Sequence, residues 1–278
     1  VVMNSRYMFK SFINTKFSSR HLNRTGVSFR MSDTDLDIRS DVNGTLSQIS
    51  AFQGSSLQLS AYSSSRFRLA EKSTLIAGVN ALYNDINEEV IIEPRISFRQ
   101  EFGGMNAISL ATGMHSREEP LNMYFYKAAN GSYPNQALPL TKAAHVVLNY
   151  DRILNENTTL SAGLYYQHLY DVPVNGTFSM INAEQVWTLD DTLFAKGQGR
   201  NYGIELTVER KLSSGWYFMA NGAVFRSEYL AGDNEWRNSA YDRKFTLNAL
   251  GGKEWSCGKE DKNLFSINTR VSWSGGMY

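Results

Sequence analysis

Apolar and polar residues alternate along most of the chain with a period of two, and the pattern is clearest over residues 199–255. In its first segment, Ile204, Leu206 and Val208 fall on one parity, and charged or polar residues such as Glu205 fall on the other. Successive side chains of a strand point to opposite faces of a sheet. The pattern therefore predicts a strand with one apolar and one charged face.

About twelve segments of this kind follow one another from Ser5 to Trp273. Most contain roughly ten residues or more, the length that a tilted strand needs to cross a bilayer. Strands of soluble proteins usually contain about five to six residues. No segment sustains a helical period. Strand length therefore favours a sheet that spans a membrane.

The connections between these segments alternate in length. Short turns are predicted near Ser18, Glu71, Gly103, Asn155, Ser213 and Cys257. Long polar stretches separate them, chiefly Asp33 to Gly54, Glu118 to about Thr141 and Val174 to about Gln198, although Asn87–Glu89 is brief. Short turns on one side and long loops on the other are typical of outer-membrane barrels, in which strands must pair because lipid cannot bond their backbones.

We therefore predict an all-β fold, an antiparallel transmembrane β-barrel segment. Ile204, Leu206 and Val208 are expected to face lipid, and the polar parity is expected to face the lumen. A soluble all-β binding protein stays open as an alternative, because alternation alone does not say which face is the interior.

Composition removes several other classes of protein. The chain has 278 residues and a formal net charge of +1, so it lacks the cationic excess of nucleic-acid-binding proteins. A single cysteine, Cys257, permits no internal disulfide and no C-x-x-C motif. No run approaches the roughly 18 apolar residues of a transmembrane helix. We expect no cofactor.

Two predicted loops carry candidate ligand-binding residues. The stretch from Glu118 to Thr141 contains Tyr124, Phe125, Tyr126 and Tyr133 among several asparagines. Aromatic rings with neighbouring amides can stack on a sugar or an aromatic chelate and bond its edge, but exposed aromatic rings more often pack a loop against the barrel rim.

The second loop, Asp233 to Asn238, offers Trp236 and Arg237 and has the same two interpretations. The structural interpretation is favoured there.

No residue pattern indicates a metal centre or catalysis. Asp33, Asp35 and Asp37 alternate like the start of a calcium loop, but Ile38 and Gly44 stand where that loop needs Gly and Glu. The histidines are scattered without ligand spacing, and no nucleophile–base arrangement emerges. We expect a protein that is not an enzyme and has no metal site.

The chain ends carry a topological expectation. The first connection, after Phe17, is short, so both ends are expected on the long-loop side. A bacterial barrel normally keeps both ends in the periplasm. We therefore expect residues 1–278 to be part of a larger barrel.

The segments GRNYGIELTVERKLSSGWYFMANGAVFRSEY, WRNSAYDRKFTLNALGGKEW and VSWSGGMY, in that order, resemble the late barrel strands of TonB-dependent outer-membrane receptors of the Bacteroidetes type. The earlier PLNMYFYK and LPLTKAAHVVLNYDRILNENTTLSAGLYYQHLYDVPV resemble the middle of the same barrels. The resemblance covers most of the chain and is specific only as a combination.

The resemblance implies a barrel of about 22 strands filled by a plug domain in the bacterial outer membrane. The parent would import a siderophore, vitamin or glycan, with energy from a TonB complex that touches the plug. We expect the plug, the TonB box and the first and last strands to lie outside residues 1–278. The chain's expected partners are outer-membrane lipid, the plug and the ligand. A plugless pore or surface-binding barrel is the alternative.

Overall fold

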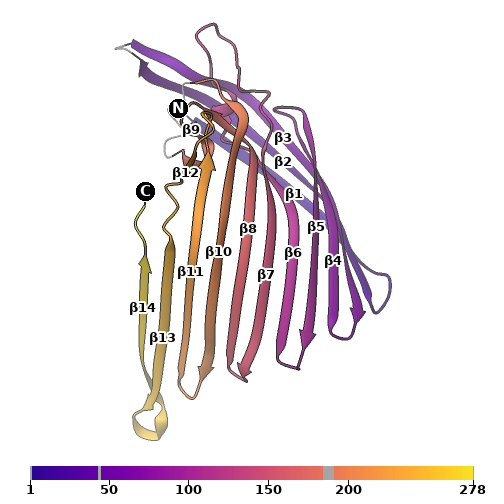
Figure 1. The fold of residues 1–278 in the computed structure, drawn as a ribbon, viewed down its shortest axis with the longest axis vertical. Coiled ribbons are helices and arrows are strands. Elements are labelled where there is room, and N and C mark those ends of the chain that lie inside the picture. The colour runs from indigo at the N-terminus through magenta and orange to yellow at the C-terminus, as the bar shows by residue number, and fades with distance from the viewer. Residues whose placement is uncertain (1, 43–44, 184–190, 278) are drawn as a thin grey trace.

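The computed structural model describes residues 2–42, 45–183 and 191–277, which form one antiparallel sheet of 14 strands (Figure 1). Its twelve principal strands are β1 (Val2–Lys16), β2 (His21–Val42), β3 (Thr45–Ala70), β4 (Ser73–Asn84), β5 (Glu89–Phe102), β6 (Asn106–Arg117), β7 (Thr141–Asn155), β8 (Thr158–Asn175), β10 (Phe194–Ser213), β11 (Trp216–Leu230), β13 (Phe245–Cys257) and β14 (Asn263–Ser274). Each pairs with the next of these along the chain.

The remaining elements are short and lie in the connections. They are α1 (Leu121–Tyr124), β9 (Phe178–Ser179), β12 (Trp236–Asn238) and two 3₁₀ turns, Met180–Asn182 and Lys259–Asp261. β9 pairs with β8, and β12 pairs with β11. In the part of the chain that the structure describes, no helix has the length and hydropathy required to cross a membrane.

Strand pairing aligns the apolar positions of neighbouring strands into continuous rows. One row runs through Phe98, Leu110, Leu148, Leu164, Ile204, Val224 and Phe245. The row displaced by one residue runs through Arg99, Ser109, Asn149, Gly163, Glu205, Ala223 and Thr246. The sheet thus has an apolar face and a polar face. Ile204, Leu206 and Val208 share the apolar face as predicted, while their contact with lipid stays a prediction.

The predicted alternation of short and long connections is present from β6 to β13, whereas β2 and β3 (Val42 to Thr45) and β4 and β5 (Asn84 to Glu89) are separated by only a few residues. Short turns join β1 to β2, β3 to β4, β5 to β6, β7 to β8, β10 to β11 and β13 to β14. These turns lie at the lower end of the sheet in Figure 1, and both marked chain ends lie toward the upper end, with the long connections. We call the upper end the long-loop side.

The expected loop from Asp33 to Gly54 is wrong, because β2 and β3 continue through it. The pairing runs from Asp33 with Ser55 to Val42 with Thr45, with one register shift after Ile38. The polar composition of this stretch conceals an alternating set of apolar residues, including Leu36 and Phe52. Their side chains pack on the long-loop side, as described below, and so extend the hairpin.

The assignment of the two faces leads to a test in the complete protein. Leu206 lies on the apolar face between Ala162 and Gly222. Leu206→Lys should lower the free energy of unfolding by about 2–4 kcal/mol, because a cation near the bilayer midplane loses its hydration. Urea unfolding of the protein refolded into lipid vesicles measures this loss.

Thr207→Lys is the matched control, since the next residue lies on the polar face between Ser161 and Asn221. It should change the unfolding free energy little. Equal losses at both positions would contradict the assignment of faces to lipid and lumen.

Candidate functional site

The long connections build a compact apolar cluster over the polar face. We call this unit the outer cap: loop residues 118–140, the β4–β5 turn, the tip of the β2–β3 hairpin from Leu36 onward, and the described residues between Val172 and Leu193. Its buried members are Leu36, Ile86, Met123, Tyr124, Phe125, Val172, Val174, Met180 and Leu193. Met123 and Tyr124 are completely buried. The cap is therefore a small core formed by segments far apart in the sequence.

Loop 118–140 reaches the hairpin by adding backbone bonds to an open strand edge. β4 pairs with β3 only from Gln58 onward, so the earlier part of β3 has a free edge. The Lys127 amide donates to the Ile49 carbonyl at 2.9 Å, and the Ser50 hydroxyl donates to the Phe125 carbonyl at 2.9 Å. These bonds cover backbone groups that would otherwise be exposed at a sheet edge.

Ring stacking reinforces this junction and reveals the curvature of the sheet. Phe52 and Phe125 stack with ring centroids 3.9 Å apart. The same cluster contacts Val172 in β8. β3 and β8 are five strand steps apart, about 24 Å along the sheet. The polar face is concave, since one hollow is lined by residues of this face from β1, such as Lys10, to β7, such as His145, and the cap lies over that side.

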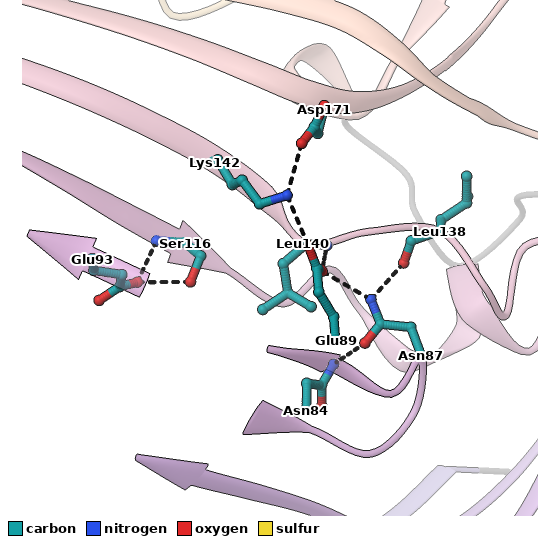
Figure 2. Close-up of polar contacts among 9 residues, drawn as sticks. All are labelled: Asn84, Asn87, Glu89, Glu93, Ser116, Leu138, Leu140, Lys142 and Asp171. Atoms are coloured by element: carbon teal, nitrogen blue, oxygen red, sulfur yellow. Dashed lines mark hydrogen bonds and ion pairs between the residues drawn. The ribbon is translucent and has the colours of Figure 1, made fainter. Parts of the chain in front are cut away.

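A polar network holds the end of the loop that leads into β7 (Figure 2). The Lys142 ammonium pairs with Glu89 at 2.7 Å and with Asp171 at 2.8 Å. The Glu89 carboxylate also accepts the Leu140 amide at 2.8 Å. Asn87 donates to Glu89 at 3.1 Å and to the Leu138 carbonyl at 2.9 Å. The β4–β5 turn, the loop end and β8 are thereby joined.

A second group of carboxylates holds the other end of the loop. Glu119 is buried, accepts the Thr141 hydroxyl at 2.5 Å and pairs with Arg117 at 3.0 Å. Glu118 pairs with Arg30, and burial raises the pKa of its carboxyl group although Arg30 opposes that shift. Burial likewise raises the pKa of the Tyr124 phenol. Both ends of loop 118–140 are therefore fastened to the sheet.

A hollow of about 870 Å³ lies between the cap and the polar face. Arg6, Arg30 and Arg117 contribute cations to its wall, while carboxylates such as Glu93 and amides such as Asn122 contribute acceptors. A space with this mixture of groups can bind a polar solute by hydrogen bonds and charge. Among the described residues, no three His, Cys, Asp or Glu side chains form a group suited to a metal ion.

The aromatic residues predicted in loop 118–140 mainly form the cap. Tyr124 and Phe125 are buried in its core, and Tyr126 forms a β-bridge with Ser50. Tyr133 is 37% exposed and lies edge-on to Phe125. Tyr124 and Phe125 thus pack the loop in this conformation. Ligand binding by Tyr124, Phe125, Tyr126 and Tyr133 stays a prediction.

Trp236 and Arg237 lie on β12, at the edge of the sheet. The Trp236 ring lies under the Arg200 guanidinium, with its centroid 4.2 Å from Cζ. Arg200 lies on the apolar face of the sheet. Tyr202, two residues further along β10, lies on the same face and pairs with Tyr166 of β8. Trp236 is therefore at the rim of the apolar face and away from the hollow. Ligand binding by Trp236 stays an untested prediction.

Arg237 is engaged by a carboxylate of its own loop. Its guanidinium forms two bonds with Asp233, at 2.6 and 2.9 Å. These bonds from Arg237 hold the pKa of the Asp233 carboxyl below its usual range. The pair closes the turn before β12, and ligand binding by Arg237 also stays a prediction.

Sequence reasoning missed the aromatic residue that lines the hollow. Tyr241 is 57% exposed there, while Asp242 next to it is completely buried. The Asp242 carboxylate accepts Arg226 at 3.1 Å and the Ser227 amide at 3.2 Å. The buried Asp242 thus fastens the loop between β12 and β13 and leaves Tyr241 exposed to the hollow. In the sequence, the signal that could have pointed to Tyr241 was Asp242, the acidic residue directly after it.

Comparison with solved structures identifies the architecture. The ferric-catecholate import receptor Fiu from E. coli K12 is similar with a TM-score of 0.72 at 12% identity, covering 100% of this chain and 45% of that one. The siderophore receptor PirA from Pseudomonas aeruginosa gives 0.68 at 12%, with coverages of 100% and 47%. The FrpB iron transporter from Neisseria meningitidis (F5-1 variant) gives 0.68 at 11%, with 97% and 43%.

At these identities the likeness shows a shared fold. This chain spans less than half of the length of each of the three proteins. No protein-family model and no curated protein match the sequence. The predicted fold class is confirmed: the sheet is an open portion of the antiparallel β-barrel found in TonB-dependent receptors.

The cap core can be tested by removing a buried side chain. Met123→Ala should lower the free energy of local opening of the cap by about 2–5 kcal/mol, because it leaves a cavity in the cluster. Hydrogen exchange over residues 49–52 and 121–127 measures that opening. Tyr133→Ala, which removes an exposed ring from the same loop, should change protection far less. Similar protection in both variants would contradict the packing described.

The polar network can be tested separately. Lys142→Met leaves Glu89 and Asp171 without their shared cation. It should speed hydrogen exchange at the Leu140 amide by an amount equivalent to about 1–3 kcal/mol. Lys127→Met is the matched control, since Lys127 donates to the neutral Gln48 side chain at 3.1 Å. If the exchange rate of the Leu140 amide were unchanged in Lys142→Met, Lys142 would not hold the loop end.

Proposed function

We propose that this chain is part of the barrel wall of a TonB-dependent outer-membrane receptor that imports a scarce nutrient. The observation that carries the proposal is the continuous apolar face opposite a polar, concave face covered by the outer cap. A transporter needs both surfaces, one for lipid and one for a lumen. In this proposal the protein resides in the bacterial outer membrane, and the chain belongs to the Bacteroidetes type.

The proposal assigns residues 1–278 to a partial barrel, with the plug, the TonB box and further strands elsewhere in the parent. The solved structures that share the fold are more than twice as long as this chain, which supports this division. Energy would come from a TonB complex acting on the plug. The wall itself would be a passive scaffold that positions ligand-binding groups.

The hollow beneath the cap is the proposed entry site for the ligand. Tyr241 offers an exposed ring, Arg6 and Arg117 offer cations, and Asn122 lines the same space. Such groups suit a solute with both aromatic and anionic parts. The similar proteins are described as receptors or transporters for a ferric catecholate, a siderophore and iron. A metal chelate is therefore the first ligand class to test, ahead of vitamins and glycans.

Growth of a deletion strain on defined iron, vitamin and glycan sources tests the proposed function. We expect a growth defect on one scarce source, restored by the complete gene and dependent on TonB. Restoration without TonB would instead support a plugless pore. Recovery of the complete protein in a soluble fraction without detergent would contradict the membrane assignment.

Residue variants locate the ligand once the source is known. Tyr241→Ala should weaken ligand binding by about 1–2 kcal/mol, roughly 5- to 30-fold in Kd, because it removes an exposed ring from the hollow. Trp236→Ala removes a ring from the other face of the same loop and should change Kd little. Titration of the purified complete protein measures both. A loss of affinity confined to Trp236→Ala would place the ligand site outside the hollow.

A further inference from the structure

Three cations lie on the apolar face near the short turns, at the lower end of the sheet in Figure 1, which we call the short-turn side. They are Arg152 on β7, Arg210 on β10 and Lys253 on β13, and the register gives all three the parity of this face. Along their lengths, β1, β4, β5 and β6 have no Lys or Arg of this parity. From β7 to β13, the face carries no Asp or Glu within residues 144–152, 158–166, 202–210, 216–226 and 245–257.

Two of these cations converge on the turn between β10 and β11. The Arg210 guanidinium lies over the Trp216 ring, with Cζ 4.2 Å from the ring centroid. Its Nη2 atom donates to the Ser213 carbonyl at 3.5 Å, while the Lys253 Nζ atom donates to the Ser214 carbonyl at 3.0 Å. The guanidinium and the ammonium group are therefore held at adjacent carbonyls of one turn, on either side of an indole ring.

Neither cation has a carboxylate partner in the chain. The ion pairs found between described residues include neither Arg210 nor Lys253. The Nε atom of Arg210 is buried and has no hydrogen-bond partner. A guanidinium has five N–H donors and an ammonium three, and the bonds to the turn use one nitrogen of each. Both groups therefore keep charge and donors for an anion that the sheet does not supply.

Exposed aromatic rings of the same face surround the two cations. Trp216 stacks on Phe218 with ring centroids 5.7 Å apart, and Trp255 lies 5.7 Å from Phe265. Trp216, Trp255 and Phe265 are exposed, and the register places all of these rings on the apolar face. Aromatic residues of barrels gather at the level of the lipid headgroups, where an amphipathic ring contacts both water and acyl chains. Cations at this level lie beside lipid phosphate.

We propose that Arg210 and Lys253, beside Trp216, bind the phosphate of an anionic glycerophospholipid at the short-turn side of the membrane. The proposal rests on the proposed function, in which the apolar face contacts lipid. Guanidinium and ammonium groups bond phosphate oxygens directly, and the apolar face beyond Phe218 would receive the acyl chains of the same molecule. A zwitterionic headgroup adds a cation, for which this end of the face offers no carboxylate. The site therefore favours a lipid with net negative charge.

Photocrosslinking of the complete protein in phosphatidylcholine vesicles tests this site. The probes are traces of phosphatidylglycerol or phosphatidylcholine with the same photoreactive acyl chain, and mass spectrometry locates the labelled peptides. In the wild type, phosphatidylglycerol should label residues 202–220 and 245–257 about fivefold more than phosphatidylcholine does, since interfacial cations favour an anionic lipid. Arg210→Gln combined with Lys253→Gln should abolish this preference there and leave labelling elsewhere on the apolar face unchanged.

Lys16→Gln combined with Arg66→Gln is the matched control. These two residues share a row of the polar face with Leu22 near the same end of the sheet. The control removes one Lys and one Arg, as the test variant does, but from the face that does not contact lipid. It should keep the wild-type preference for phosphatidylglycerol. An equal loss in both double variants would show that general surface charge attracts the lipid, and would overturn the site.

The remaining outcomes are also decisive. If Arg210→Gln with Lys253→Gln does not fold, Lys253→Met alone keeps the stack of Arg210 on Trp216 and should lower the local preference about twofold. Equal labelling of these peptides by both probes in the wild type overturns the proposal. Loss of the preference when inorganic phosphate is added would identify a site for the free anion and overturn the lipid assignment. A wild-type protein that does not enter vesicles would contradict the proposed function as well.

Discussion

Backbone pairing between neighbouring strands is the constraint on which the rest of the structure depends. Each principal strand bonds to the next strand of the meander, so a side chain has a fixed neighbour on either side. A one-residue slip would turn every side chain of a strand to the other face. The register therefore preserves both the row that contains Leu164 and Ile204 and the adjoining row that contains Glu205. The apolar face and the polar face of the sheet therefore both follow from the register of the strands.

The sequence was sufficient to predict this part of the structure because the signal is local. A period of two at Ile204, Leu206 and Val208 needs no knowledge of distant residues, and the short turns lie where small and polar residues break the alternation. Among the described residues, the pattern misled chiefly in residues 33–54, where polar neighbours surround Leu36 and Phe52, and β10 also begins at Phe194, inside the predicted loop that ends near Gln198. Apolar residues of this hairpin pack in the outer cap, and these tertiary contacts stabilise it.

The outer cap was not predictable in the same way, because its contacts join residues far apart in the chain. Leu36, Met123 and Val172 come from three distant segments and meet only in the folded structure. Glu89 and Asp242 resemble ordinary loop acids in the sequence, yet each has hydrogen-bonding partners and Asp242 has no exposed surface. A loop rich in Tyr and Asn looks suited to ligands, whereas here Tyr124 mainly supplies volume to a core.

The junction between β3 and loop 118–140 also has a mechanical meaning. Between Gln58 and its tip, the β2–β3 hairpin projects like a cantilever, because β4 does not pair with β3 before Gln58. The stacked rings of Phe52 and Phe125, the backbone bond accepted by Ile49 and the bond donated by the Ser50 hydroxyl hold the hairpin near its free end. The stiffness of the hairpin on the long-loop side therefore depends on a few contacts near its tip. A small change at these contacts would alter the range of motion of the whole hairpin.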